Sequence, residues 1–235
     1  MDIDALWLTL RLAALTTVIL IIVAIPIAAW LAFHRRAYTP VLEAVVALPL
    51  VLPPTVLGYY LLVAMGSQSP LGQWWINTFG STLAFSFNGL LVASIISSLP
   101  FAVHPLLTAF TSVPARLLQA STTLGAGWPR TIVKVALPLS RSGLATSAVL
   151  AFAHTLGEFG VVLMVGGNIP GQTRTLSIDV YDSVQAFDYS AAASTSAFLL
   201  VFSLLVLTIT YTVNYRSGLP RHLSSRQLQP TSVMQ

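Results

Sequence analysis

The sequence predicts an all-α membrane protein with five transmembrane helices, its amino terminus outside and its carboxyl terminus inside. Three observations predict this class. Of the 235 residues, 55% are hydrophobic and only 8% are charged, whereas about 25% of the residues in a soluble domain are charged. The apolar residues form runs close to the roughly 20 residues that cross a bilayer. Finally, the basic residues gather in alternate connecting segments, which predicts the orientation.

Five apolar runs mark the expected spans. They are Leu12–Phe33, Val41–Met65, Leu83–Val103, Leu144–Val165 and Ala191–Val213. The first run is too long, and too poor in flanking basic or cleavage signals, for a removed signal peptide. We expect residues 1–215 to form a single transmembrane domain and residues 216–235 to form a basic cytoplasmic tail.

Nine of the eleven basic residues lie in three segments that five spans place on one side of the membrane. They are Arg35, Arg36, Arg116, Arg130, Lys134, Arg141, Arg216, Arg221 and Arg226. The positive-inside rule assigns this side to the cytoplasm. Because orientation accounts for the net charge of +4, nucleic acid is not an expected partner. The absence of cysteine excludes disulfides and thiol-based metal sites or nucleophiles.

Prolines interrupt the first two runs. Pro26 should kink the first helix rather than end it. The second run contains Pro49, Pro53 and Pro54, each of which removes a backbone donor. Within a membrane, a broken helix is tolerated where it is buried in protein or lines a wet cavity. We therefore expect Pro53 and Pro54 to line a pathway, with a packed structural kink as the alternative.

The fourth run contains two ionisable residues, His154 and Glu158, which are four residues apart and share one face of a helix. Counting about 1.5 Å per residue from Leu144 puts them near or beyond the bilayer centre. An ionisable residue at that depth is a functional candidate. For Glu158 two roles stay open: helix packing or gate structure, and contact with a substrate or proton. His154 is expected to be a satisfied interior polar group.

Residues 104–143 form the long polar segment of the chain. Pro114 opens a predicted helix, and Gly125 and Gly127 permit a sharp reversal after it. A second short helix is predicted to begin at Trp128 and to stop at Leu137–Pro138. Two short helices joined by a glycine turn form a compact surface that fits a groove in a soluble protein. The alternative is a re-entrant or merely connecting loop.

The spacing in this segment resembles the EAA motif of ABC-importer permeases, which reads E-A-A, three residues, Gly, nine residues, I-x-L-P. The matching positions are Gln119, Ala120, Ser121, Gly125, Val135, Leu137 and Pro138. Three of them differ from the motif: Gln119 replaces the Glu, Ser121 replaces the second Ala and Val135 replaces the Ile. The resemblance implies a type I importer-like bundle whose loop contacts an ATPase. The chain lacks a G-x-x-x-x-G-K-[ST] loop, so a separate subunit would use the ATP. The chain itself is expected to bind no cofactor or metal and to have no catalytic residue.

Three further segments resemble the molybdate permease subunit of bacterial ABC importers. They are Leu48–Leu62, Thr155–Gly160 and Gly167–Thr175. The resemblance implies a homodimer in the bacterial inner membrane, with two ATPase subunits and an external oxyanion-binding protein. Tungstate remains an alternative substrate. Sulfate/thiosulfate permeases share the Gly-Glu-Phe-Gly segment but match the proline-rich segment less closely.

An oxyanion substrate makes Arg174 and Thr175 candidates for substrate contact, because guanidinium and hydroxyl groups donate to such anions. The alternative for Arg174 is a salt bridge to the binding protein, or to Asp179 or Asp182. A direct role for Glu158 in holding a dianion is implausible, because like charges repel strongly in a low dielectric. The pathway and gate candidates are Pro53, Pro54, Glu158, Arg174 and Thr175.

Two other classes of protein fit the sequence less well. An intramembrane enzyme would need a buried nucleophile–base or carboxylate pair, and the sequence contains no recognisable motif of that kind. A channel or ion-coupled secondary transporter would leave the glycine-hinged inner segment unexplained. The sequence also has no convincing inverted repeat of the kind that marks many secondary transporters.

Overall fold

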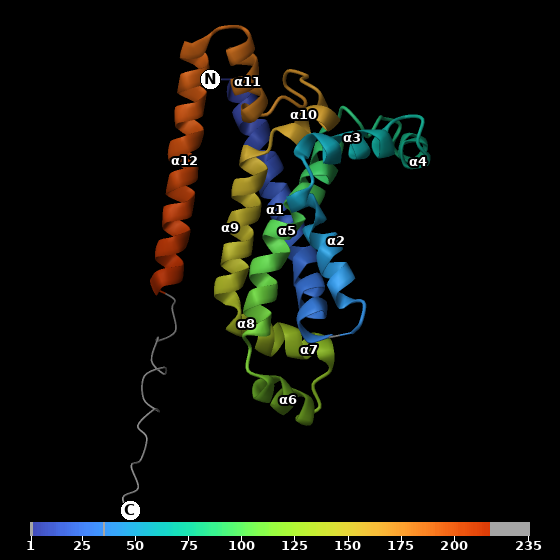
Figure 1. Cartoon of the computed structure of the whole chain (residues 1–235), viewed down its shortest axis with the longest axis vertical. Helices are drawn as coiled ribbons and strands as arrows, with labels where there is room; N and C mark the ends of the chain where they lie inside the picture. The colour runs from blue at the N-terminus through green and yellow to red at the C-terminus, as the bar shows by residue number, and fades with distance from the viewer. Residues whose placement is uncertain (1, 35, 217–235) are drawn as a thin grey trace, which may run out of the picture.

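The computed structural model describes residues 2–34 and 36–216, and the regular structure within these residues is helical (Figure 1). Three of the described helices are long and apolar enough to cross a membrane: α1 (Ile3–Phe33), α5 (Phe87–Thr111) and α12 (Tyr189–Arg216). Two further pairs of bent helices each pass the same test together, so the described part of the chain has three to five candidate spans.

The centre of the bundle is α1, which packs against α5 and α9 (Arg141–Gly157). Leu12, Leu20 and Ala24 of α1 are fully buried, and they recur at multiples of four residues along one face. The helix begins earlier than the predicted Leu12, because Asp2 caps it and accepts a hydrogen bond from the N–H of Asp4 at 2.9 Å. A capped polar first turn therefore extends the apolar helix outward.

The second span is broken, as the prolines predict. It consists of α2 (Thr39–Val51) and α3 (Pro54–Met65), which meet at an angle of 107°. Leu52 and Pro53 are extended, with ψ values of 136° and 133°. Each precedes a proline, whose ring disfavours the helical conformation of the residue before it. The short helix α4 (Pro70–Phe79) follows and projects sideways from the bundle (Figure 1).

The third span differs from its prediction at both ends. Ser86 caps α5 by accepting from the N–H of Gly89, and the helix continues through Pro100 and Pro105 to Thr111. The predicted run ended at Val103, and the polar segment was expected to begin at residue 104. Prolines are tolerated in membrane helices, where neighbouring groups satisfy the freed carbonyls, so Pro105 did not end this one.

The inner segment forms α6 (Ala115–Thr123), α7 (Trp128–Thr131), the π-helix η1 (Ile132–Ala136) and α8 (Leu137–Leu139). The prediction of two short helices is confirmed, but the predicted stop at Leu137–Pro138 is wrong. The N–H of Leu137 donates to the carbonyl of Ile132, five residues back. This wider turn admits Pro138, which has no N–H to donate. The second helix therefore runs on to Leu139 and meets α9 at an angle of 82°.

The predicted fourth span, Leu144–Val165, is also broken, which the sequence analysis missed. It divides into α9 and α10 (Gly160–Gly166), and Glu158 forms the cap of α9 with a ψ of 129°. Glycines lower helix propensity, and they flank the break on both sides. In this region, the bent pair that is long and apolar enough to cross a membrane consists of Trp128–Leu139 and α9, and does not include α10.

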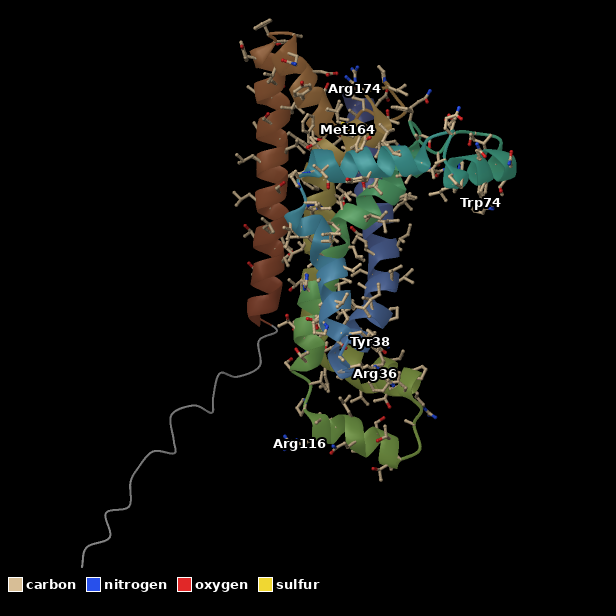
Figure 2. All side chains as sticks on the ribbon, turned by 45° about the vertical axis from the view of Figure 1, so that its right-hand side comes forward. Arg36, Tyr38, Trp74, Arg116, Met164 and Arg174 are labelled. Carbon is tan, nitrogen blue, oxygen red and sulfur yellow. The ribbon has the colours of Figure 1, made fainter. Side chains whose placement is uncertain are left out.

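The last elements are α11 (Leu176–Gln185) and α12, which packs against α11 and α9 at one side of the bundle (Figure 1). Figure 2 shows Arg36 and Arg116 at the end of the bundle that carries α6, and Arg174 at the opposite end. Most of the predicted tail, 217–235, with Arg221 and Arg226, lies outside the described residues, as does Arg35.

Candidate functional site

The breaks in the second and fourth spans lie against each other. Helices α3 and α10, which follow the two breaks, are packed together. A β-carbon at Gly160 would lie 2.7 Å from Cβ of Pro54, and one at Gly58 would lie 2.8 Å from Cβ of Met164. Both distances are too short for a β-carbon, so glycine at 58 and 160 permits this close approach. The structure therefore joins two predicted features, Pro54 and the segment after Glu158.

Glu158 is held at this junction through its backbone. Its carbonyl, which the break frees from the helix, accepts a hydrogen bond from Oγ of Ser177 at 2.6 Å. Oγ of Ser177 also lies 2.9 Å from Oγ1 of the buried Thr175. Glu158 and Thr175, both predicted site residues, thus belong to one hydrogen-bonded chain that links α9 to α11.

The side chain of Glu158 is 5% exposed, and its Oε2 has no hydrogen-bond partner among the described residues. Oε2 lies 3.6 Å from Nδ1 of His154, four residues earlier, as the shared helix face predicts. His154 Nδ1 also lies 2.9 Å from Oγ of Ser98, and its ring stacks on Phe101 at 4.0 Å. The prediction of His154 as a satisfied interior group is confirmed, since α5 supplies both of these contacts.

Arg174 belongs to a separate cluster on the segment between α10 and α11. Its Nε donates to Oδ1 of Asn168 at 2.7 Å, and its Nη2 lies 3.5 Å from Oδ2 of Asp182. Asn168 in turn donates from Nδ2 to the same Asp182 oxygen, which closes a triad. Of the two intrachain salt bridges weighed from the sequence, the one with Asp182 is present, whereas the carboxylate of Asp179 accepts from Thr195 at 3.4 Å.

The inner segment lies at the other end of the bundle (Figure 1). No residue of α6 is buried within the described part of the chain, and Leu117 and Leu124 are 39% and 87% exposed. Gln119, Ala120 and Gly125 are also exposed. Leu118 of α6 packs against the core, whereas the exposed leucines leave the outer face of the segment without a partner in the described chain, as in a docking surface.

Two contacts hold the inner segment together. Oγ of Ser121, on α6, lies 2.9 Å from Oγ1 of the buried Thr131, on α7. Gly125, between them, has a φ of +79°, a value that L side chains rarely adopt, so it makes the predicted reversal. Gly127 is extended, with a φ of −67°, and needs no such freedom. Val135 and Leu137 are half-buried and Pro138 is exposed along the second helix.

Trp128 joins the inner segment to the membrane helices, a role that sequence analysis missed. Its ring meets Phe33 edge-on at 5.2 Å and His34 at 5.3 Å, both at the end of α1. Phe33 in turn lies 5.9 Å from Phe110 of α5. The cluster of aromatic residues at the end of the first span was the available signal, but only the three-dimensional structure brings Trp128 to it.

No group of three or more metal-ligating side chains occurs among residues 2–34 and 36–216. The candidate residues lie in three places: the junction of broken helices, the cluster around Arg174 near the same end of the bundle, and the exposed helical surface at the other end.

The family model described as "Binding-protein-dependent transport system inner membrane component" matches residues 8–217. The chain is 50% identical over 219 residues to the molybdenum transport system permease protein ModB of Azotobacter vinelandii, covering 93% of this chain and 97% of that protein. It is 39% identical over 165 residues to the protein of the same name from Escherichia coli K12, covering 70% and 71%.

Two solved structures have a similar fold. One is a bacterial ABC transporter for import of the acidic polysaccharide alginate, with a TM-score of 0.73 and 18% identity, over 91% of this chain and 79% of that one. The other is the MetNI methionine ABC transporter in an inward-facing conformation, with a TM-score of 0.70 and 16% identity, over 92% and 95%.

Proposed function

The chain belongs to the family of binding-protein-dependent transport system inner membrane components, and we propose that it is the membrane subunit of an ATP-driven molybdate importer. The observation that carries this proposal is the 50% identity to a molybdenum transport permease over nearly the whole of both chains. The chain is a multi-pass protein of the bacterial inner membrane. In this function it forms the translocation pathway and catalyses no reaction itself.

The proposed assembly contains two copies of this chain, two separate ATPase subunits and an external oxyanion-binding protein. The absence of a phosphate-binding loop supports a separate ATPase, which would bind the ATP. A solved relative of similar fold is an alginate transporter in complex with its periplasmic protein. We propose five spans, with the basic end that carries Arg36 and Arg116 in the cytoplasm and the end with Arg174 outside.

The exposed surface of α6 is the proposed contact with the ATPase. Gln119 replaces the glutamate of the motif, and it keeps the size and hydrogen-bonding capacity of that residue. ATP-driven movement of α6 would pass to α7 through Ser121 and Thr131, and then through Trp128 to the end of α1. The short contacts along this route support a rigid connection.

The junction of broken helices is the proposed gate. Pro53 and Pro54 are exposed in the single chain, so they are available to line a pathway or to meet a second copy. The carboxylate of Glu158 is buried beside His154, and the backbone of Glu158 carries the link to Ser177. We therefore assign Glu158 to the structure of the gate, since a carboxylate would repel a dianion.

Arg174 is the proposed oxyanion contact near the outer end, whereas the hydroxyl of its predicted partner Thr175 is buried and hydrogen-bonded to Ser177. The guanidinium is partly buried and is positioned by Asn168 and Asp182. A pre-organised donor loses less conformational entropy when it binds an anion. Its partial neutralisation by Asp182 would also keep the anion from being held too tightly to be released.

Competition between oxyanions tests the substrate. Proteoliposomes would hold this chain with its partner ATPase, with ATP enclosed and the binding protein outside, and uptake of molybdate would be measured against excess tungstate or sulfate. The proposal predicts that tungstate blocks uptake and sulfate does not, because molybdate and tungstate are nearly identical in charge and shape. Uptake dominated by sulfate would be consistent with the importer architecture but would contradict molybdate as the substrate.

A further inference from the structure

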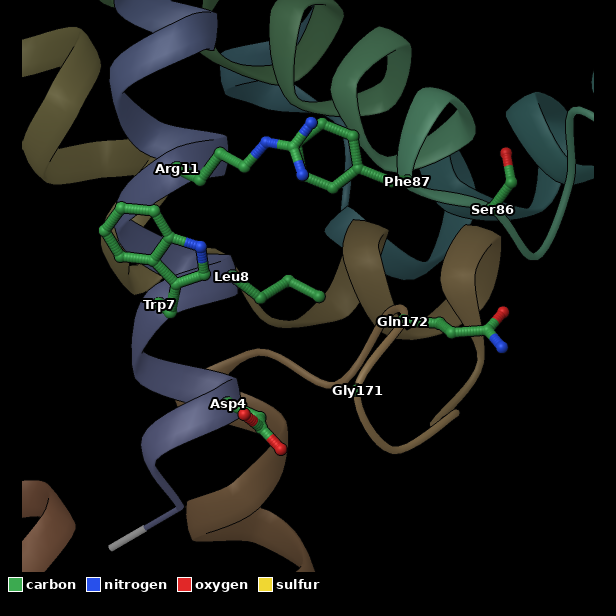
Figure 3. A pocket seen from close by; sticks show the side chains of 8 residues that line it. All are labelled: Asp4, Trp7, Leu8, Arg11, Ser86, Phe87, Gly171 and Gln172. Carbon is green, nitrogen blue, oxygen red and sulfur yellow. The ribbon is translucent and has the colours of Figure 1, made fainter.

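A cavity of about 460 Å³ lies beside the first turns of α1, away from the gate and from the inner segment. Its lining comes from α1, from the start of α5 and from the segment before α11, as Figure 3 shows. The lining residues are Asp4, Trp7, Leu8, Arg11, Ser86, Phe87, Gly171 and Gln172. Its volume lies within the range of roughly 300 to 1,000 Å³ typical of small-molecule sites.

Arg11 is the cation of this cavity. Its guanidinium carbon lies 4.5 Å from the centre of the Phe87 ring, a cation–π contact that positions the side chain across the cavity (Figure 3). It forms no ion pair with any of the described residues. The planar guanidinium therefore keeps donors available for a phosphate or another oxyanion. Gln172 also lines the cavity, from the segment before α11, and its side-chain amide has no hydrogen-bond partner in the described chain.

The groups along this face of α1 follow the same order as the chemical parts of a phospholipid. Leu15, Val18 and Ile22 are 38%, 58% and 66% exposed and continue the face toward the middle of the helix. Arg11 comes next, and Asp4 lies outermost, about 10 Å farther along the axis at 1.5 Å per residue. From the centre of a bilayer outward, a phospholipid presents its acyl chains, its phosphate and then its headgroup amine.

Trp7 lies between the two charges and is 70% exposed. Tryptophan is enriched where the hydrocarbon meets the headgroups. This places the cavity at the depth of the headgroups whichever leaflet it faces.

We propose that this cavity binds the headgroup of a zwitterionic phospholipid, with Arg11 donating to the phosphate and Asp4 accepting from the ammonium group. The proposal depends on the proposed function only for the placement of α1 across the membrane. The bound lipid fixes the start of α1 against the segment 167–175, which carries the gate-side residues Arg174 and Thr175.

Asp4 selects the headgroup. A dissolved dianion such as molybdate gains from Arg11 but is repelled by the nearby carboxylate. An anionic phospholipid without an amine leaves Asp4 with no partner. Phosphatidylethanolamine satisfies both charges, so it should bind better than phosphatidylglycerol. An arginine that merely extends toward the headgroups, as many do at helix ends, would not make this distinction.

Native mass spectrometry of the purified complex of this chain with its ATPase tests the proposal. The complex would be delipidated and then titrated with phosphatidylethanolamine or phosphatidylglycerol. We expect the wild-type complex to retain phosphatidylethanolamine preferentially. Arg11→Gln should weaken retention of both lipids about tenfold, the usual effect of losing one charged hydrogen bond. Arg11→Lys, which keeps the charge, should retain more lipid than Arg11→Gln.

Asp4→Asn is the selective variant. In this variant the complex should retain the two lipids equally, and the total amount of retained lipid should stay unchanged. Arg141→Gln, an exposed arginine at the opposite end of the bundle, is the matched control and should behave as wild type. Wild-type retention of both lipids in Arg11→Gln, or an unchanged preference between them in Asp4→Asn, would overturn the proposal.

Displacement of the lipid by millimolar molybdate would also overturn it, by identifying a site for dissolved oxyanions. The measurement needs no transport activity. Failure of the lipid site would therefore leave the transport proposal untouched, and failure of molybdate uptake would leave the lipid result standing.

Discussion

Gly160 packs directly against Pro54, so closely that a β-carbon at position 160 would lie 2.7 Å from Cβ of the proline. Pro54 begins the helix after the break in the second span, and Gly160 begins the helix after the break in the fourth. The two interruptions are therefore one structural feature. Neither proline nor glycine is incidental, because the proline begins one helix and the glycine lets the other approach it.

Gly160→Ala should disturb this contact. The added methyl group meets the rigid proline ring, and overpacking of this kind costs about 1 to 3 kcal/mol. We expect a lower melting temperature of the complex and slower uptake. Gly157→Ala is the matched control, because a β-carbon there has no neighbour within 4 Å. Equal effects of the two substitutions would show that the contact with Pro54 has no special role.

Gly125→Val should uncouple ATP hydrolysis from transport. The φ of +79° strains a β-branched residue, at a cost of about 1 to 3 kcal/mol, and the turn between α6 and α7 should shift. We expect normal membrane insertion, hydrolysis without uptake and weaker co-purification of the ATPase. Gly127→Ala, at an unstrained position with open space around it, should behave as wild type. Wild-type uptake in Gly125→Val would contradict the docking role of this turn.

Trp128→Ala should separate the inner segment from α1. Because the ring of Trp128 contacts both Phe33 and His34, its removal should preserve ATPase binding but reduce the uptake achieved per ATP hydrolysed. The ratio of molybdate transported to phosphate released measures this directly. Trp128→Phe should restore part of the ratio through its remaining edge contact. Trp74→Ala, at an exposed position on α4, serves as the control and should leave the ratio unchanged.

Arg174→Ala should lower uptake by removing an oxyanion donor. Asp182→Asn separates this role from that of the ion pair, because Nε of Arg174 still has its hydrogen bond to Asn168. We expect Asp182→Asn to retain most of the uptake, with concentration dependence close to that of wild type. If both variants lose uptake and stability equally, Arg174 acts through its ion pair with Asp182 and does not contact the substrate.

Much of the architecture follows from local sequence. The prolines at 53 and 54 predicted the break in the second span because their effect is local to the backbone. Gly125 likewise predicted the reversal in the inner segment. The break at Glu158 was missed because the fourth run is apolar on both sides and contains no proline there. The packing of Gly160 on Pro54 and the hydrogen bond from Ser177 to the freed carbonyl stabilise the break, and neither is visible in the sequence.

The helix ends were less predictable, for a different reason. Hydropathy marks where a helix can be buried in hydrocarbon, and it does not mark where the helix ends. α1 begins outside its apolar run because Asp2 caps it. The second inner helix continues through Pro138 to Leu139 because the wider turn of the π-helix η1 admits a residue that has no N–H to donate. Similarly, the contact of Trp128 with α1 depends on a long-range arrangement that spacing along the chain does not encode.

In the proposed mechanism, this chain moves molybdate only when a separate ATPase drives it. Proteoliposomes containing the chain and binding protein would be compared with and without the ATPase, with ATP or a non-hydrolysable analogue enclosed. We expect molybdate uptake only when the ATPase and hydrolysable ATP are both present. Uptake by the chain without the ATPase, sustained by an ion gradient, would contradict it and identify a secondary transporter instead.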